Sequence, residues 1–465
     1  MKLRYYIQTF GCQMNAHDSE RMAGMLEALG YSSTAEPAEA DVLLMNTCAV
    51  RERPEHKLYT ELGQLRLLKE TKPDLIIGVA GCMAQREADN IRRRVPEVDI
   101  LLGPRNIHHL PHLIRQAQRT STRFAGENDG LDLDCDPTPI TPVRRTSAVS
   151  AYVDVVFGCN FNCTYCAVPS ARGREISRRP GEVLDEIRQL SDLGYREVTL
   201  LGQTVNAYGH DLGRLETGSR IDFAWLLEQI DAIAPNLRVR YTSPHPMYFN
   251  ERLIDAIANT GSVCEHLHMP LQSGSNSCLS RMKRTYTIEK YKSIVERVRE
   301  RIPDVAITTD CIVGFCGETE EEYQETVRAF QEIRFDNAFL FAYSPRHSTP
   351  AFDWPDDVPA SKKNRRLVQL IDLQREISRD INLDQVGQTV EVLVEGRSAK
   401  DAARLSGRTR GNKLVNFAGD MDATPPGSLV NVRTTGGFLW GFSGDKIQTV
   451  AAPHAARTII ELVAA

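Results

Sequence analysis

The sequence has no long apolar run, and neither sign of charge is in large excess. None of its apolar runs approaches the roughly 18 residues that a membrane-spanning helix needs. Residues Met1–Gly11 also lack the basic and then apolar pattern of an export leader. We therefore expect a cytoplasmic protein with no membrane partner. Because the formal net charge is only -5, a nucleic-acid site would have to rest on local basic patches.

A disulfide framework is also not indicated, although the chain contains eleven cysteines. The cytosol keeps thiols reduced, and clustered cysteines in such proteins more often bind metal or carry out chemistry. The positions of these cysteines are therefore the main guide to function.

The length of 465 residues predicts two to four domains, at roughly 100 to 200 residues each. Residues 1–120 alternate apolar runs with amphipathic stretches and predict an open α/β domain. Residues 121–147 are rich in Gly, Asp, Pro and Thr and predict a linker. Residues 148–382 contain six strand-like runs with helical patterns between most of them, which predicts an incomplete (βα)6 barrel. Residues 383–450 predict a small C-terminal β-barrel, followed by a tail at 451–465.

The densest group of cysteines is Cys159, Cys163 and Cys166, on a short loop after the first predicted barrel strand. Thiolates are soft ligands that suit iron-sulfur clusters or zinc, and a cubane cluster usually takes four of them. Three local cysteines would leave one iron free to bind a substrate or cofactor. A structural zinc, or a cluster with a distant fourth ligand, is the alternative. The position favours the open cluster, because barrel active sites form on the loops that follow the strands.

Three further cysteines, Cys12, Cys48 and Cys82, each follow an apolar run in the first domain. Ligands gather at the carboxyl ends of the strands in an open, mostly parallel sheet, so these thiols can converge in one crevice. The repeated arrangement predicts a second three-cysteine cluster. The alternative is three unrelated buried thiols, since free cysteine is often buried.

The spacing of Cys159, Cys163 and Cys166 resembles that of the radical S-adenosylmethionine (SAM) superfamily. The resemblance implies a 4Fe-4S cluster whose open iron chelates SAM, and a 5'-deoxyadenosyl radical as the product of SAM cleavage. The chain is also similar to the methylthiotransferase family within it. The motifs that carry this similarity are Gln8–Asn15, Asn46–Cys48, Gly81–Cys82, Arg172–Glu175, Gln272–Ser275, Thr309–Phe315 and Tyr343–Arg346.

In that family a second 4Fe-4S cluster is the place where one SAM methylates sulfur, while another SAM supplies the radical. The branch that this chain resembles most adds the methylthio group to carbon 2 of N6-dimethylallyladenosine at position 37 of tRNA. The residues behind this choice are Gln8–Asn15, Val50–Glu52, Lys57, Leu201–Gln203, Val205–Asn206 and Leu267–Gln272, with Thr204 as a departure. A sibling, RimO-like branch acts on an aspartate of a ribosomal protein. A non-catalytic RNA-binding protein with structural metal sites is the alternative of another class.

The resemblance also implies binding residues and partners. Those expected to bind SAM are Gly314, Gly317 and Glu318, and those expected to bind substrate are Gln203, Asn206, Gln272 and Ser273. The last region resembles a TRAM domain, an RNA-binding barrel, and its candidate phosphate contacts are Arg404, Arg408, Arg410 and Lys413. A solvated basic face is the alternative there. The implied partners are tRNA, a reduced electron donor such as flavodoxin or ferredoxin, and a sulfur donor or cluster-repair system; we expect a monomer.

Several other metal-ligating side chains receive no role from the sequence. His108, His109 and His112 follow a helical pattern and are predicted to be surface residues. Cys135 is interpreted as a structural or incidental thiol, and Cys316 as a spectator near the SAM-binding loop.

Overall fold

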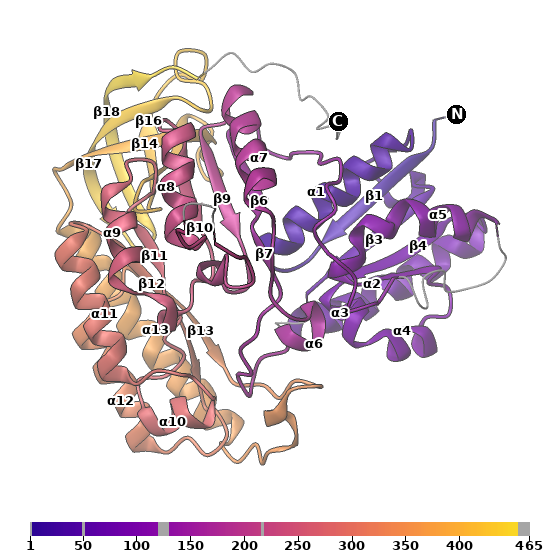
Figure 1. The fold of residues 1–465 in the computed structure, drawn as a ribbon, viewed down its shortest axis with the longest axis horizontal. Helices are drawn as coiled ribbons and strands as arrows, with labels where there is room; N and C mark the ends of the chain where they lie inside the picture. The colour runs from indigo at the N-terminus through magenta and orange to yellow at the C-terminus, as the bar shows by residue number, and fades with distance from the viewer. Residues whose placement is uncertain (1, 49–51, 120–129, 215–217, 454–465) are drawn as a thin grey trace.

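The computed structural model describes residues 2–48, 52–119, 130–214 and 218–453. Three units lie side by side, with the N-terminal one joined to a central barrel and the small C-terminal barrel stacked against the far side of it (Figure 1). Val50, Arg51, residues 121–129 of the predicted linker and residues 454–465 of the predicted tail lie outside the described residues.

The N-terminal unit is a parallel five-stranded sheet in the order β2-β1-β3-β4-β5. Its strands are β1 (Arg4–Thr9), β2 (Ser32–Ser33), β3 (Val42–Thr47), β4 (Ile76–Gly81) and β5 (Ile100–Leu102). The segments between them are α1 (Gln13–Ala28), η1 (Pro37–Glu39), α2 (Glu52–Thr71), α3 (Cys82–Arg86), α4 (Ala88–Arg94), η2 (Pro104–His109) and α5 (Leu110–Arg119).

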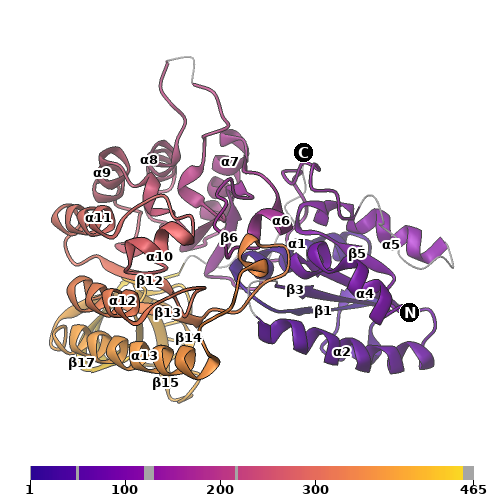
Figure 2. The same cartoon turned by 90° about the horizontal axis from the view of Figure 1, so that it is seen from below.

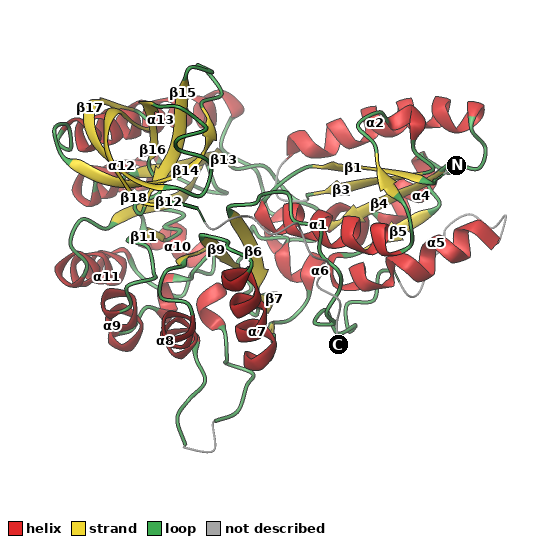
Figure 3. Ribbon diagram, turned by 90° about the horizontal axis from the view of Figure 1, so that it is seen from above, coloured by secondary structure: helices red, strands yellow, loops and turns green. Residues whose placement is uncertain are grey.

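Both faces of this sheet are covered, which explains why β3 and β4 are buried along their whole length. Leu44 and Ile100 pack on one face with apolar residues of α1 and α5. Leu43 and Val79 pack on the other face with residues of α2, α3 and α4. The carboxyl ends of the strands are left open toward the barrel (Figure 3).

The central unit contains six parallel strands in two sheets, β10-β9-β6 and β11-β12-β13. A parallel bridge between Val239 and Val263 joins the two sheets, so the strands form an incomplete barrel. Its strands are β6 (Ser150–Asp154), β9 (Glu197–Leu201), β10 (Arg238–Tyr241), β11 (His266–His268), β12 (Ala306–Val313) and β13 (Asn337–Ala342), with a hairpin of β7 (Val156–Phe157) and β8 (Ile176–Ser177).

The helices of the barrel cover its outer face and bury one continuous apolar core. They are α7 (Pro180–Asp192), α8 (Phe223–Ile233), α9 (Glu251–Asn259), α11 (Ile288–Arg301) and α12 (Glu320–Ile333). The loops between the elements carry the shorter helices α6 (Val168–Arg172), η3 (Val205–Ala207), η4 (Pro246–Tyr248), α10 (Asn276–Arg281) and η5 (Pro350–Asp353). Side-chain caps fix several starts; at α12, Thr319 and Glu322 form a reciprocal capping box.

The C-terminal unit is a closed barrel in the order β14-β15-β16-β18-β17, preceded by the long helix α13 (Ala360–Leu383). Its strands are β14 (Thr389–Arg397), β15 (Arg404–Thr409), β16 (Leu414–Ala418), β17 (Leu429–Phe438) and β18 (Gly441–Ala451). Figure 2 shows α13 beside α12, with the C-terminal strands behind it.

The sequence-based fold class is confirmed: an open α/β unit, an incomplete barrel of six strands and a small β-barrel follow one another along the chain. Among the described residues, no helix is both long and apolar enough to cross a membrane.

Candidate functional site

The loop that carries Cys159, Cys163 and Cys166 runs between β7 and α6. The backbone amide of Cys166 donates to the carbonyl of Cys163 at 3.0 Å, which curls the loop so that its thiols lie near one another. Gly158 starts this loop with φ of +75°, and a Cβ there would lie 2.0 Å from the carbonyl oxygen of Arg174. Only glycine allows the loop to leave the hairpin in this direction.

Within this loop Cys163 is buried and Cys159 and Cys166 are half-buried, and one half-buried cation, Arg284, lies beside it. Burial, followed by the nearby Cys163, raises the pKa of the Cys166 thiol to about 12. Arg284 donates from Nη1 to the Sγ of Cys163 at 3.4 Å. Deprotonation of the Cys166 thiol therefore needs a positive partner such as a metal cluster, with Arg284 contributing part of the charge. No sequence motif pointed to Arg284.

The second set of cysteines also converges, as the strand-end pattern predicts. Cys12 caps α1, Cys48 follows β3 and Cys82 begins α3. A hydrogen bond with Cys48 lowers the pKa of the Cys12 thiol to about 5 against the opposing effect of burial. A Cβ on Gly11 would lie 2.4 Å from that of Cys48, so glycine at this position permits the close approach.

Arg172 links this second set to the barrel. It ends α6, yet its buried guanidinium lies in the N-terminal unit, where Nη2 donates to Asp18 at 2.8 Å and to Asn15 at 3.3 Å. Burial acts to lower the pKa of Arg172, but Asp18, Cys82 and Cys12 raise it well above its ordinary value. A fixed positive charge from the barrel therefore stands beside the N-terminal thiols.

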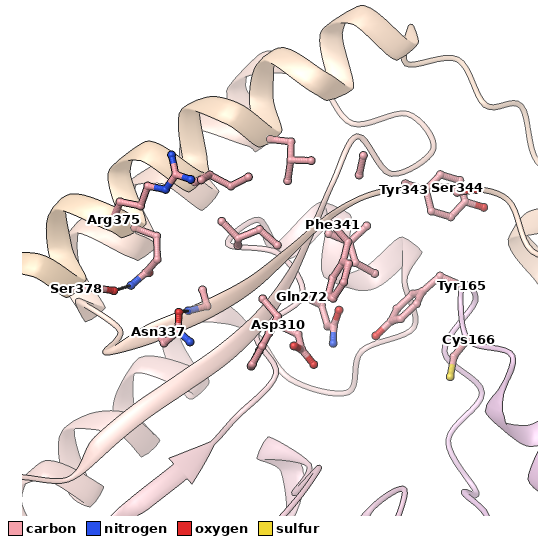
Figure 4. Close-up of a pocket in the computed structure, with 18 of the residues that line it drawn as sticks. Tyr165, Cys166, Gln272, Asp310, Asn337, Phe341, Tyr343, Ser344, Arg375 and Ser378 are labelled. Atoms are coloured by element: carbon pink, nitrogen blue, oxygen red, sulfur yellow. Dashed lines mark hydrogen bonds between the residues drawn. The ribbon is translucent and has the colours of Figure 1, made fainter. Parts of the chain in front are cut away.

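A cavity of about 770 Å³ opens next to the barrel loop (Figure 4). Tyr165 and Cys166 lie at one end of it, and Arg375 and Ser378 of α13 lie at the other. Its remaining lining comes from β12, β13 and α13, together with Leu439 and Trp440 of the C-terminal unit. A mostly apolar hollow of this size, with a few polar groups, is typical of a site for a small organic group.

Of the four residues expected to bind substrate, only Gln272 lines this cavity. Gln272 lines it beside Asp310, and Gln203 accepts from the amide of Gly158 under the cysteine loop. Asn206 is instead hydrogen-bonded to the backbone of His245. Ser273 is fully buried and contacts Thr326. Asn206 and Ser273 therefore hold loops in place and do not face the cavity.

The residues expected to bind SAM form a turn after β12. Gly314 has φ of +71°, and its amide donates to Glu318 at 2.6 Å. Glu318 is buried and paired with the fully buried Arg366 at 2.7 Å. Gly317 also has a positive φ, of +71°. The carboxylate of Glu318 is thus occupied within the protein, and its evident role is to shape this turn.

The four basic residues of the C-terminal unit divide into two pairs. Arg410 is paired with Glu265 at 2.7 Å, and Lys413 with Asp336 at 2.8 Å, so both face the central barrel. Arg404 and Arg408 are half-buried on β15, and Arg408 contacts Glu395. The charges of Arg410 and Lys413 thus join the two units. That the four basic residues bind phosphate stays a prediction.

His108 and His109 are more enclosed than the helical pattern predicts. Both are half-buried at the end of η2 and contact Cys135, whereas His112 is exposed. The sequence pattern missed this group because Cys135 approaches from a segment without regular structure.

Family models match the three units in order. The "Uncharacterized protein family UPF0004" matches residues 4–103, the radical SAM superfamily matches residues 153–330 and the TRAM domain matches residues 384–435. The radical SAM family implies a 4Fe-4S cluster and SAM.

Among solved structures, the radical SAM methyltransferase TsrM from Kitasatospora setae has a TM-score of 0.53 at 16% identity. The similarity covers 76% of this chain and 77% of that one, and it supports the fold alone.

Curated relatives extend over nearly the whole chain. Several of them are named tRNA-2-methylthio-N(6)-dimethylallyladenosine synthase. The one from Geobacillus kaustophilus is 44% identical to this chain, and the match covers 96% of this chain and 82% of the relative. The relative from Carboxydothermus hydrogenoformans is 45% identical, and the match covers 95% of this chain and 98% of the relative. The relative from Desulforamulus reducens is 47% identical, and the match covers 93% of each chain. Three domains in the same order and identity at this level lead to one conclusion: this chain belongs to the radical SAM family of tRNA-2-methylthio-N(6)-dimethylallyladenosine synthases.

Proposed function

We propose that this enzyme adds a methylthio group to carbon 2 of N6-dimethylallyladenosine at position 37 of tRNA, with one SAM as methyl donor and another as radical source. The observation that carries the proposal is the short connection between the two cysteine sets. Cys166 precedes α6 and Arg172 ends it, and a helix of five residues is only roughly 7 Å long. One base can therefore be within reach of both sites.

The donor sets fit two iron-sulfur clusters. Cys159, Cys163 and Cys166 would hold one cluster, and Cys12, Cys48 and Cys82 would hold the other. Each set offers three soft thiolates, which leaves one iron without a cysteine ligand. When bound, these clusters and SAM supply the electron, the radical, the sulfur and the methyl group.

The protein's own side chains prepare the site for a base that carries an apolar substituent. Ile371 and Phe341 give the cavity apolar walls, while Gln272 and Asp310 give it hydrogen-bonding groups. Trp440 is 62% exposed and lines the mouth, where its indole can stack on a nucleobase. The mostly apolar walls of the cavity also limit the water that could quench reactive species.

The remaining parts of the proposal concern the rest of the chain. We assign residues 1–120 to the auxiliary cluster, 148–382 to the radical cluster and 383–450 to RNA binding. Arg404 and Arg408 would contact phosphates without reading sequence. A tRNA substrate places the reaction in the cytoplasm, with a flavodoxin or ferredoxin as electron donor and a sulfur donor or repair system to restore the auxiliary site.

The proposal is tested with anaerobically purified and reconstituted enzyme, SAM, a reductant and tRNA containing N6-dimethylallyladenosine. Nucleoside mass spectrometry should detect a methylthio adduct on that nucleoside, together with 5'-deoxyadenosine. Formation of 5'-deoxyadenosine with no modification of tRNA, but with a methylthio adduct on ribosomal protein, would overturn the substrate assignment.

A further inference from the structure

A third group of metal-ligating side chains lies outside both cysteine sets. His108 and His109 end η2, and Cys135 follows in the segment that leads to the barrel. The Sγ of Cys135 is 3.6 Å from the Nε2 of His108 and 3.5 Å from the Nε2 of His109. All three ligand atoms lie within 4.8 Å of one another.

These distances match the edges of a tetrahedral zinc site. Zinc binds sulfur at about 2.3 Å and imidazole nitrogen at about 2.0 to 2.1 Å, and tetrahedral angles then separate sulfur from nitrogen by about 3.6 Å. One thiolate and two imidazoles are also a donor set that zinc accepts readily. The Nε2 atoms of His108 and His109 already lie at about this distance from the Sγ of Cys135.

Several buried polar atoms around this group have no hydrogen-bond partner within the described residues. Within the described part of the chain, Asn106 is fully buried, and neither its amide nitrogen nor its oxygen has a hydrogen-bond partner. The Nδ1 of His108 is buried without a partner as well. Asn106 lies close enough to Cys135 to influence the pKa of its thiol, which burial raises and Asn106 lowers in part. Apart from this interaction with the Cys135 thiol, the buried amide has no protein partner, and such a group usually has a water or an ion beside it.

Charges of both signs surround the group, because Arg105 lies near the Cys135 thiol and Arg21 near His108, together with two carboxylates. Asp132 and Asp136 both act on the Cys135 thiol as nearby negative charges. A bound metal would deprotonate that thiol and gain from both carboxylates.

We propose that His108, His109 and Cys135 form a structural zinc site that fixes the segment before the barrel to the N-terminal unit. Arg105, on the same 3-10 helix, donates to the carbonyls of Cys135, Arg172 and Arg174 at 3.0, 3.1 and 3.1 Å. Zinc would thus hold the linker at the point where the N-terminal unit contacts the loop after α6. This inference does not depend on the proposed methylthio transfer.

The experiment is zinc and iron analysis of the full-length, cluster-loaded enzyme after incubation with stoichiometric zinc, followed by zinc K-edge X-ray absorption. We expect about one zinc per chain with a single sulfur neighbour and nitrogen or oxygen neighbours otherwise. Failure to retain zinc would overturn the proposal. Zinc with three sulfur neighbours would overturn it too, because the metal would then occupy a cysteine set meant for iron.

Variants locate the zinc. Cys135→Ala and His109→Gln should each lower zinc content more than about 10-fold at unchanged iron content, since each removes a ligand. His112→Ala is the matched control, because this exposed histidine lies three residues from His109 and outside the group. Full zinc retention in Cys135→Ala, or equal loss in His112→Ala, would contradict the assignment. If a variant also loses iron, its zinc content no longer locates the site. The number of sulfur neighbours around zinc in the unaltered enzyme then decides between the proposed site, with one sulfur, and a cysteine set, with three.

Discussion

The two cysteine sets differ in how the chain builds them. Cys159, Cys163 and Cys166 lie within eight residues of one loop, whereas Cys12, Cys48 and Cys82 come from three separate strand ends. The loop is fixed by local backbone geometry and by Arg284 from its own domain. The strand-end site depends on the packing of a whole sheet and receives Arg172 from the neighbouring domain. The first site can therefore form without the second, but the second needs both domains in place.

The largest effect is expected from Cys163→Ala. This substitution removes one of the three proposed ligands of the loop cluster. Mutation of a residue that only supports a metal ligand typically lowers metal affinity or activity 10- to 100-fold. Because Cys163 is a proposed ligand itself, we expect formation of 5'-deoxyadenosine to fall more than about 100-fold. Chromatography of the small-molecule products measures this. Cys316→Ala, which removes a buried thiol outside both sets, should stay close to the unaltered rate. Equal loss in both variants would contradict a special role for Cys163.

Arg172→Met tests the dependence of the strand-end site on the barrel. It leaves Asp18 buried without its partner, and breaking a buried ion pair costs about 3 to 5 kcal/mol. The iron content should fall by about half, to one cluster per chain, while SAM cleavage persists. The cluster that is lost should be the one in the N-terminal unit, even though residue 172 belongs to the barrel. Arg172→Lys keeps the charge and should retain more iron. Loss of SAM cleavage before loss of the second cluster would contradict the division between the sites.

Trp440→Ala tests whether the cavity mouth binds a base. Stacking of a base on an aromatic ring contributes about 1 to 3 kcal/mol, so KM for tRNA should rise about 10-fold or more. Phe438→Ala is the control, because Phe438 is 59% exposed but does not line the cavity. The ratio of the two KM values, measured under the same reductant, separates stacking from general damage to the C-terminal barrel.

The smallest effect is expected from Arg404→Gln and Arg408→Gln. Each should weaken tRNA binding a few-fold and reduce the slope of log affinity against log salt by about 0.7 for each phosphate that the enzyme no longer neutralises. Filter-binding titrations at several salt concentrations give this slope. Arg410→Gln should leave the slope unchanged and lower the melting temperature, because it breaks the ion pair with Glu265.

The sequence predicted the elements that local patterns determine. Spacing predicted a cluster site at Cys159, Cys163 and Cys166, and the repeated strand ends predicted that Cys12, Cys48 and Cys82 lie near one another, as they do in the structure. That the two sets bind clusters stays a prediction. It could not show that Arg172 leaves its own domain, or that Arg410 and Lys413 turn toward the barrel, because such contacts depend on how the domains dock. Ser273 and Asn206 were assigned from motif similarity, but burial decides their role.

The central claim is that the two sites have separate tasks, and the products formed by Cys48→Ala test it most directly. In the presence of SAM, reductant and the modified tRNA, this variant should still form 5'-deoxyadenosine, with no methylthio adduct in the tRNA digest. A methylthio adduct, or the complete loss of 5'-deoxyadenosine in a variant that retains one full cluster, would contradict the account.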